Sequence, residues 1–515
     1  MAINDFDSDE HWIDTKLVGD ARDDFPTIHP LKENVRAIVQ VAKDRQGQEA
    51  FDRTLAREMN GLSMKEREQR FEEMHGVSSF IDETPSFVAE ALWKLDQELA
   101  SIPQKSAYNL AYSMDRSYVE DNKFRLMFLR ADLFDAKKAA ERLVLFFEKK
   151  LKFYGPATLV RSILMSDLGD DDITTLKSGV FQILPSRDRA GRPILFLCSN
   201  CGPKLYTSPL SFLRCWWYSV IAAFEEDEET QRRGAVVIIW WMDYLRRESD
   251  LTPELRKEIF GAIKWLPIRP YNSMHICADD TLSKRLLARV QIALSPPEIR
   301  YNYKVHFGGL TEVLYHLMSF GIPVDAIPVS VSGTIKTKDF LKWIVRRKKK
   351  EDYLVYHGRT ARWDRVDLPN LNDVLFAKGR PYQHHPGNQE YLRLIQDCLY
   401  EYDNAANRRD KRSVACNLID SMRARSTRFL IKDNDDWWVE ASEKDLHEKV
   451  IKAFSHASAS SKKKASICQI KYHESPMGKR LRIEPRIGVD GAPDVPCLTQ
   501  SCFLLDHHKG HTLTA

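Results

Sequence analysis

The spacing of apolar residues predicts helices throughout the first third of the chain. Between residues 31 and 155 the apolar positions recur three or four residues apart, which places them on one face of a helix. Capping residues mark several ends: Ser63 and Glu66 fit a capping box, Asp135 is a natural N-cap and Gly155 is a natural stop. We therefore predict a helical N-terminal module over residues 31–155.

The pattern changes near Phe181, where short runs of consecutive apolar residues begin. Such runs are typical of strands that are buried on both faces of a sheet. The runs lie in FQILPSRDRAGRPILFLCS, GAVVIIWW, SMHIC and KVHF, and helical patterns such as SFLRCWWYSVIAAFEED and TLSKRLLARVQIAL lie between them. Strands that alternate with helices predict an α/β domain with a parallel or mixed sheet. We place this domain at residues 156–330.

Beyond the sheet domain the sequence predicts a linker and a second, smaller unit. KTKDFLKWIVRRKKKED has the pattern of a charged helix, so residues 331–370 are expected to form a charged helical linker. A small α+β module follows over residues 371–454, in the order helix, helix, hairpin, helix, with RFLIKD and WWVEA alternating around NDD as the strands of the hairpin. The ends of the chain, residues 1–30 and 455–515, are expected to be disordered tails.

Composition narrows the class of protein. The 515 residues are 43% hydrophobic and 29% charged, as in ordinary globular proteins. No apolar run reaches the roughly 18–20 residues of a membrane span, the first residues lack the apolar core of a secretory signal, and nine irregularly spaced cysteines favour a reducing compartment. We expect a cytoplasmic protein that contacts a membrane surface transiently at its periphery, with the nucleus as an alternative location. The net charge of +4 provides no global basic field for nucleic acid.

The sequence contains none of the common catalytic or metal-binding motifs. It has no G-x-S-x-G elbow, Walker loop, H-E-x-x-H or dinucleotide-binding glycine pattern. Cys198 and Cys201 form a C-x-x-C pair, but no helical pattern starts directly after it and no second pair of ligands follows. The acidic run from Asp170 to Asp172 has the pattern of a solvated turn that caps a helix. We therefore expect no enzymatic activity, no cofactor and no metal site.

Two motifs in the first two-thirds of the chain resemble those of a known family. The segment KFRLMFLRADLFDAKKAAERL carries the first motif, at Phe128, Leu129, Arg130, Ala131, Phe134, Asp135, Ala139 and Ala140, and DRAGRPILF carries the second. In this order, and with the strand and helix plan that ends in HFGGLTEVLYHLMSFGIPVDAIP, they resemble the CRAL-TRIO family of phosphatidylinositol-transfer proteins over residues 60–330. The resemblance implies an apolar cavity between a sheet floor and a mobile gate helix, which holds a lipid or another hydrophobic small molecule.

Apolar residues on the predicted strands and on the predicted gate helix are the candidates for this cavity. They are Phe196, Trp240, Ile276, Leu286, Val290 and Leu294. The last three are spaced by four on one helical face, which fits a gate and equally fits plain core packing. Binding, and with it transfer or sensing, of a hydrophobic ligand is the first functional hypothesis. Within DRAGRP, we interpret Asp188 and Gly191 as turn formers and Arg192 as a brace for the loop.

A set of residues in the C-terminal module forms a recognisable motif: Asp373, Val374, Lys378, Gly379, His385, Pro386, Gly387, Asn388, Arg428, Phe429, Leu430, Trp437 and Trp438. With this motif the module resembles an uncharacterised family, a domain of unknown function that is common in microalgal proteins. Ala377 stands where the family has the first glycine of a tight loop, and Asn388 lies where the following helix needs an N-cap. The adjacent His384 and His385 lack a convincing third metal ligand, so we interpret this segment as a turn and helix start.

Basic residues along the second predicted helix of this module favour the binding of an acidic partner. They include Arg408, Arg409 and Arg412, and phosphate contacts by such a stripe would depend on salt concentration. Acidic residues elsewhere in the module roughly balance the charge, and a solvated basic face is an alternative explanation. The second functional hypothesis is a regulatory or scaffold protein whose C-terminal module binds DNA or a protein partner.

Overall fold

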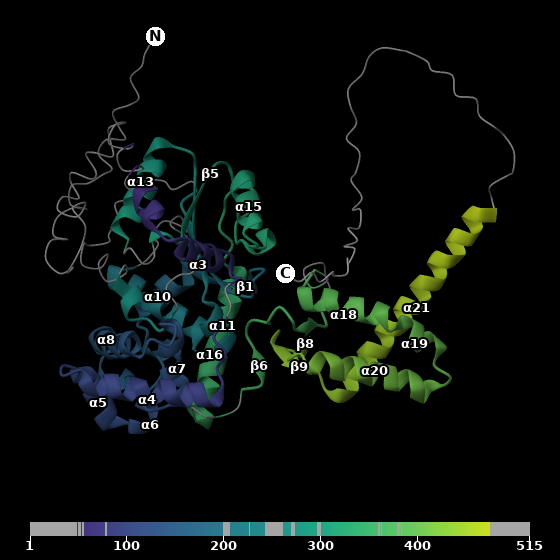
Figure 1. The fold of residues 1–515 in the computed structure, drawn as a ribbon, viewed down its shortest axis with the longest axis horizontal. Coiled ribbons are helices and arrows are strands. Elements are labelled where there is room, and N and C mark those ends of the chain that lie inside the picture. The colour runs from purple at the N-terminus through teal and green to yellow at the C-terminus, as the bar shows by residue number, and fades with distance from the viewer. Residues whose placement is uncertain are drawn as a thin grey trace, which may run out of the picture. The chain divides into compact units, whose positions relative to one another are not determined.

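The structure of the chain is a computed structural model, shown in Figure 1 with its colour running along the sequence. It describes residues 49, 53, 56–77, 80–198, 207–225, 227–242, 261–268, 273–295, 300–358, 361, 363–377, 382 and 384–473. The tail predicted over residues 1–30 lies outside the described residues, as do Cys201 of the C-x-x-C pair and Gly379 of the C-terminal motif.

Helices form the N-terminal module, as predicted. They are α3 (Met64–His75), α4 (Pro85–Ser101), α5 (Ser106–Met114), α6 (Arg116–Val119), α7 (Asn122–Ala131) and α8 (Ala136–Tyr154). The predicted caps are confirmed. The Ser63 hydroxyl and the Glu66 carboxylate each accept a hydrogen bond from the other residue's backbone N–H, while Asp135 caps α8 and Gly155 ends it at a φ of 81°. These caps satisfy helix-terminal N–H and C=O groups that would otherwise lack partners.

Five strands form the sheet, in the spatial order β1-β2-β3-β4-β5. They are β1 (Phe181–Arg187), β2 (Pro193–Cys198), β3 (Val236–Trp240), β4 (Ser273–Ala278) and β5 (Tyr303–Phe307). Strand β1 is antiparallel to β2, and the remaining neighbours are parallel. The predicted mixed sheet is therefore confirmed.

Helices and short 3-10 turns connect the strands. They are η4 (Pro156–Thr158), η5 (Met165–Asp167), α9 (Asp170–Lys177), α10 (Pro209–Phe224), α11 (Glu228–Arg233), η6 (Ala262–Lys264), α13 (Leu282–Leu294), α15 (Leu310–Ser319) and η7 (Val324–Ala326). The acidic run caps α9 as predicted, because the Asp172 carboxylate accepts a hydrogen bond from the Gly169 N–H at 3.0 Å. Asp170 and Asp171 are exposed, whereas Asp172 is buried beside the Arg214 guanidinium at 3.0 Å. Acidic side chains are stabilising at a helix N-terminus, which explains the run.

The two faces of the sheet have different surroundings. Because the parallel strands follow one another across the sheet, right-handed crossovers place their helices on one face. This α10 face carries Leu195, Leu197, Val237, Ile239, Met274, Ile276, Tyr303 and Val305. The opposite α15 face carries Phe196, Ile238, Trp240, His275, Cys277 and His306, and its apolar members pack with Val313 and Leu317 of α15. The alternation follows from the two-residue period of a strand.

Helix α16 (Lys338–His357) is the charged helix predicted for the linker, and it is packed against the sheet domain. Phe340, Trp343 and Ile344 join the core that surrounds α8 and α10. The buried Glu351 carboxylate accepts hydrogen bonds from the Tyr218 hydroxyl at 2.6 Å, from Arg347 at 2.8 Å and from the Met165 backbone N–H at 2.6 Å. The sequence did not predict this burial, because the apolar positions of α16 are outnumbered by its charges.

The C-terminal module has helices before and after a hairpin, as predicted, but the first predicted helix is divided in two at Cys398 and two further strands were not predicted. Its elements are β6 (Arg365–Val366), β7 (Val374–Leu375), α18 (Pro386–Asp397), α19 (Leu399–Asn404), α20 (Arg408–Arg423), β8 (Phe429–Lys432), β9 (Trp438–Glu440) and α21 (Glu443–His473). The antiparallel β8–β9 hairpin is flanked by β6 and β7, in the order β6-β9-β8-β7. The tail predicted from residue 455 is helical as far as His473. None of the described helices has the length and hydropathy to cross a membrane.

A chain of buried hydrogen bonds links β5 and β4 to α3 on the α15 face. His306 and His275 are joined through Nε2 and Nδ1 at 2.8 Å, and His275 Nε2 lies 2.7 Å from the Ser273 hydroxyl. The Ser273 hydroxyl donates to the Met74 thioether at 3.2 Å. Because a thioether only accepts, the Ser273 hydroxyl accepts from His275 Nε2, and His275 Nδ1 accepts from His306 Nε2. His275 therefore donates through one ring nitrogen and accepts through the other, which makes it neutral.

We expect the free energy of unfolding to decrease as the pH falls from about 6.5 toward 4. Burial and the nearby His306 and Arg192 hold the pKa of His275 well below its usual 6.5, and burial lowers the pKa of His306 to about 4. The unfolded chain takes up these protons first, so the stabilisation is complete above pH 6.5 and is lost below it. The loss is about 1.4 kcal/mol per pH unit for each such proton. Urea unfolding at a series of pH values measures this slope.

A variant that cannot be protonated at position 306 shows whether His306 contributes to this decline in the free energy of unfolding. His306→Gln keeps a donor and an acceptor at this position, and it should flatten the decline between pH 6.5 and 4. The matched variant His384→Gln changes a histidine that is exposed to solvent, and it should leave the decline unchanged. An unaltered slope in the His306→Gln protein would contradict the assignment.

Candidate functional site

A row of apolar side chains crosses the α10 face of the sheet. The strand register aligns Leu197, Ile239, Ile276 and Val305 on β2 to β5. Ile276 is fully buried, whereas the other three are partly exposed. On the α15 face, by contrast, Phe196 and Trp240 are at most 2% exposed. The α10 face is therefore apolar and incompletely covered, as the wall of a site for an apolar ligand would be.

Helix α13 is held close to this row by polar contacts at both of its ends. Near its start, the Lys284 ammonium donates to the Trp241 carbonyl at 2.8 Å. At its end, Gln291 and Ser295 bond to the Tyr303 hydroxyl at 3.3 and 3.1 Å. Tyr303 lies on the α10 face, where burial raises its pKa and keeps the phenol neutral. These contacts position α13 beside the sheet without placing a charge on the row.

The six residues predicted for the cavity do not all lie on one side of the sheet. Ile276 lies in the apolar row, and Leu286 is buried on α13. Phe196 and Trp240 point to the opposite face, where their ring centroids are 5.8 Å apart in the core beneath α15. Val290 and Leu294 belong to α13, but their side chains lie outside the described residues. The structure therefore does not bring Phe196 and Trp240 together with Ile276.

The DRAGRP turn joins the sheet to α3. The backbone turns at Gly191 with a φ of 82°, and the Asp188 carboxylate pairs with the Arg192 guanidinium at 2.7 Å. Arg192 also donates to the carbonyls of Glu73 and Met74 at 2.7 and 3.1 Å. These carbonyls lie at the C-terminal end of α3, where helix carbonyls lack intrahelical partners. Arg192 therefore has the bracing role predicted for it, and its partner is a helix end.

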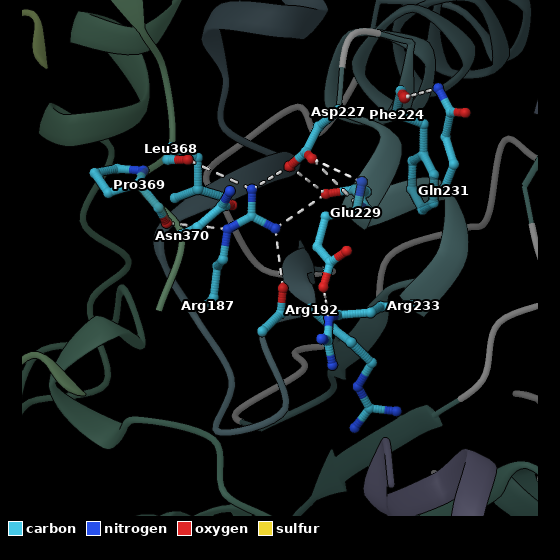
Figure 2. A network of polar contacts seen from close by, with 12 residues as sticks. Arg187, Arg192, Phe224, Asp227, Glu229, Gln231, Arg233, Leu368, Pro369 and Asn370 are labelled. Atoms are coloured by element: carbon cyan, nitrogen blue, oxygen red, sulfur yellow. Dashed lines mark hydrogen bonds and ion pairs between the residues drawn. The ribbon is translucent and has the colours of Figure 1, made fainter. Parts of the chain in front are cut away.

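Arg187, which the sequence did not single out, anchors the segment that leads into the C-terminal module (Figure 2). Its guanidinium donates to the Pro369 and Leu368 carbonyls at 3.0 and 3.4 Å, to Thr230 and the Gly191 carbonyl, and to the Asp227 carboxylate. The Asp227 carboxylate also caps α11. All the donor capacity of a buried arginine is used, as burial of this charge requires.

The motif of the C-terminal module holds β7 against α18. The Asn388 side chain bonds to both the N–H and the carbonyl of Leu375, at 2.6 and 2.9 Å, and so occupies the open edge of β7. Asn388 was predicted as the N-cap of this helix, which is incorrect: His385 is the N-cap and Pro386 the first helical residue. Proline suits the first helical position, where no N–H is needed. His384, just before this helix, is exposed to solvent.

Asp373, His385 and Gly387 complete the motif in structural roles. The buried Asp373 carboxylate makes two bonds to Arg428, at 3.0 and 2.7 Å. A Cβ on Gly387 would lie 2.1 Å from the Asp373 carbonyl, so only glycine fits this approach. Burial lowers the pKa of His385, which favours the neutral ring. Among the described residues no group of three or more histidine, cysteine or acidic side chains is arranged to hold a metal ion.

The basic residues of α20 divide into two groups. At its C-terminal end and just beyond, Arg423, Arg425 and Arg428 pair with Glu443, Glu390 and Asp373, respectively. At its N-terminal end Arg408, Arg409 and Arg412 are exposed, and no ion pair joins them to the described acidic residues. Cationic side chains are unfavourable near a helix N-terminus. This end of α20 is therefore a basic surface that contributes nothing evident to folding.

Sequence patterns missed the residues that define the α10 face. Leu197 and Ile239 belong to apolar runs in which every position looked equally buried, and Val305 lies between Lys304 and His306. The two-residue period relates positions within one strand, but the alignment of these residues with Ile276 depends on the register between strands, which only the structure shows. Phe196 and Trp240 were chosen for their size, which does not distinguish the two faces of a strand.

The comparisons with known proteins identify the C-terminal module alone. A family described as "Domain of unknown function (DUF6824)" matches residues 373–456. The uncharacterised family predicted over residues 371–454 is thereby confirmed, with ends that differ by two residues. No curated protein matches the chain. The CRAL-TRIO resemblance over residues 60–330 has no match in the family comparison and stays a prediction.

We expect Gly387→Ala to destabilise the C-terminal module. The added methyl group would collide with the Asp373 backbone and force β7 and α18 apart, and overpacking of this kind costs about 1–3 kcal/mol. Gly61→Ala is the matched control, because a Cβ at Gly61 meets nothing within 4 Å. Chemical denaturation of the two variants measures the difference, and equal stability would contradict the structural role of Gly387.

Proposed function

We propose that the sheet domain binds a lipid or another hydrophobic small molecule on the α10 face of its sheet. The observation that carries the proposal is the row Leu197–Ile239–Ile276–Val305, which is wholly apolar although three of its four side chains are partly exposed. Exposed apolar area of this kind costs free energy unless it serves binding. The CRAL-TRIO resemblance of residues 60–330 favours the same location, between a sheet floor and a helix.

The polar contacts of α13 support this assignment. The Lys284 ammonium donates to the Trp241 carbonyl. The side chains of Gln291 and Ser295 donate to the Tyr303 hydroxyl, so none of these contacts places a charge on the row itself. A hydrophobic ligand would gain about 25 cal/mol for each Å² of apolar surface removed from water. Because Phe196 and Trp240 lie on the other face, we assign the wall of the site to Leu197, Ile239, Ile276 and Val305.

Val305→Trp tests this site. The larger side chain would cover its apolar neighbours in the row. We expect it to reduce the lipid retained by the full-length protein several-fold, as measured by native mass spectrometry and by uptake of a fluorescent phospholipid. Val331→Trp is the matched control, because Val331 is 99% exposed and lies outside the sheet. If the unaltered protein carries no lipid and takes up none, the proposal fails.

A second function, contact with nucleic acid, is favoured by the exposed arginines at the start of α20. Arg408, Arg409 and Arg412 have no acidic partner among the described residues, whereas the arginines at the other end of the helix are paired. If these side chains contacted DNA phosphates, they would release the counterions bound to the DNA, so the affinity would fall steeply as the salt concentration rises. A role for this surface in binding an acidic protein would have the same charge requirement.

The salt dependence of DNA binding distinguishes a nucleic-acid function of this surface from binding of an acidic protein. In gel-shift titrations, Arg408→Gln with Arg409→Gln should lower the slope of log affinity against log salt by about 2, since each phosphate contact contributes about 0.9. Lys123→Gln with Lys137→Gln removes the same charge from exposed positions of the helical module and should leave the slope unchanged. No mobility shift at low salt would exclude the nucleic-acid function.

A further inference from the structure

A pocket of about 510 Å³ lies on the C-terminal module, away from the apolar row of the sheet domain. It is lined by Phe376, Ala377, Tyr382, Ile431, Lys432, Asp445 and Lys449. Phe376 and Ala377 follow directly after β7, Tyr382 lies between β7 and α18, and the others belong to β8 and to the first turns of α21. All of them fall within residues 373–456, so the pocket is formed wholly by the domain of unknown function.

At the wall of the pocket formed by Ile431 and Lys432, strand β8 extends beyond the end of its neighbour β7. Strand β7 pairs with β8 only at Phe429 and Leu430, whereas β8 continues to Lys432. On the other side of β8, the Asp433 N–H bonds to the Trp437 carbonyl, so the alternation of an antiparallel pair directs the N–H and carbonyl of Lys432 away from β9. The Lys432 backbone therefore faces the side on which β7 has ended, where it offers a donor to a ligand.

Two ammonium groups flank the pocket, each placed over aromatic rings. Lys449 Nζ lies 5.2 Å from the centroid of the Phe376 ring. Lys432 Nζ lies 5.2 Å from the Trp438 ring and 6.0 Å from the Tyr382 ring, and it pairs with Asp436. No ion pair joins Lys449 to a described acidic residue. Contact with an aromatic ring positions an ammonium group but leaves most of its hydrogen-bonding capacity unused.

The single carboxylate of the lining, on Asp445, already has a partner. It accepts a hydrogen bond from the Ser442 hydroxyl at 2.7 Å, and that hydroxyl in turn accepts from the Asp445 backbone N–H. This contact caps the start of α21 and directs the carboxylate toward the helix end. Asp445 keeps its charge, and the donors that can reach a ligand are the Lys449 ammonium, the Lys432 backbone N–H and the Tyr382 hydroxyl, with the Lys432 ammonium shared with Asp436. The rest of the lining is hydrocarbon, from Phe376, Ala377 and Ile431.

We propose that this pocket binds a small organic oxyanion, in which a phosphate or carboxylate group is attached to a flat apolar body. The oxyanion accepts hydrogen bonds from Lys449 and Lys432, and the apolar body lies against Phe376 and Ile431. The volume is within the range of small-molecule sites, about 300–1,000 Å³. The site is independent of the lipid proposal, because it lies in a different domain and recognises charge.

Isothermal titration calorimetry of the full-length protein with phenyl phosphate, benzoate and inorganic phosphate tests the proposal. We expect phenyl phosphate or benzoate to bind with one-to-one stoichiometry, and the tighter of the two identifies the anionic group. Lys449→Gln should weaken binding about tenfold or more, as loss of a charge-assisted hydrogen bond does. Lys449→Arg, which keeps the charge, should restore most of the affinity.

Lys452→Gln is the matched control on the same helix. Lys452 is exposed and bonds to Glu448 at 2.6 Å, so its replacement should leave binding unchanged. Inorganic phosphate that binds as tightly as phenyl phosphate would overturn the role of the apolar body. The absence of binding at millimolar concentrations, or equal binding by the Lys449→Gln protein, would overturn the site.

Discussion

The buried guanidinium of Arg187 is the interaction on which the arrangement of the described chain depends. It forms hydrogen bonds to three segments that are distant in sequence: the β1–β2 turn, the N-terminus of α11 and the irregular segment at Leu368 and Pro369. A buried charge is tolerated only where its donors are satisfied, and the removal of one partner from such a pair costs about 3–5 kcal/mol. The position of each segment is therefore constrained by the others, and the entry into the C-terminal module is fixed at the sheet domain.

Other buried arginines attach the helical parts to the sheet domain in the same manner. Arg130 on α7 bonds to Glu83 and Gln231, and Arg142 on α8 bonds to Asp132 and to the Leu266 carbonyl. Arg347 and Glu351 do so for α16. An apolar contact is non-directional, whereas a guanidinium and a carboxylate must meet in a defined geometry. These pairs therefore specify how the helices dock, while the aromatic core supplies most of the stabilisation.

The sequence predicted those features that depend on local patterns, and missed those that depend on partners far along the chain. The capping box at Ser63 and Glu66 and the β8–β9 hairpin follow from a few neighbouring residues, so the pattern predicted them correctly. Asn388 was assigned to a helix cap because the helix is its nearest neighbour, yet its partner is Leu375 on β7. The face of β2 and β3 that forms the apolar row could not be read from continuous apolar runs, which have no polar side. The burial of α16 depends on Tyr218 and Met165, which no local pattern connects to Glu351.

The hydrogen bonds of Arg187 and Glu351 also limit the order in which contacts can form while the protein is being synthesised. Arg187 bonds to a carbonyl 182 residues later, and Met165 bonds to a carboxylate 186 residues later. A ribosome that has just released β5 and α15 exposes a sheet domain whose buried arginine still lacks the carbonyls of Leu368 and Pro369. Contacts of such long sequence separation form late, since the loop between them must close first. The sheet domain therefore cannot complete these contacts until the segment leading into the C-terminal module has been synthesised, although all five of its strands precede that segment in the chain.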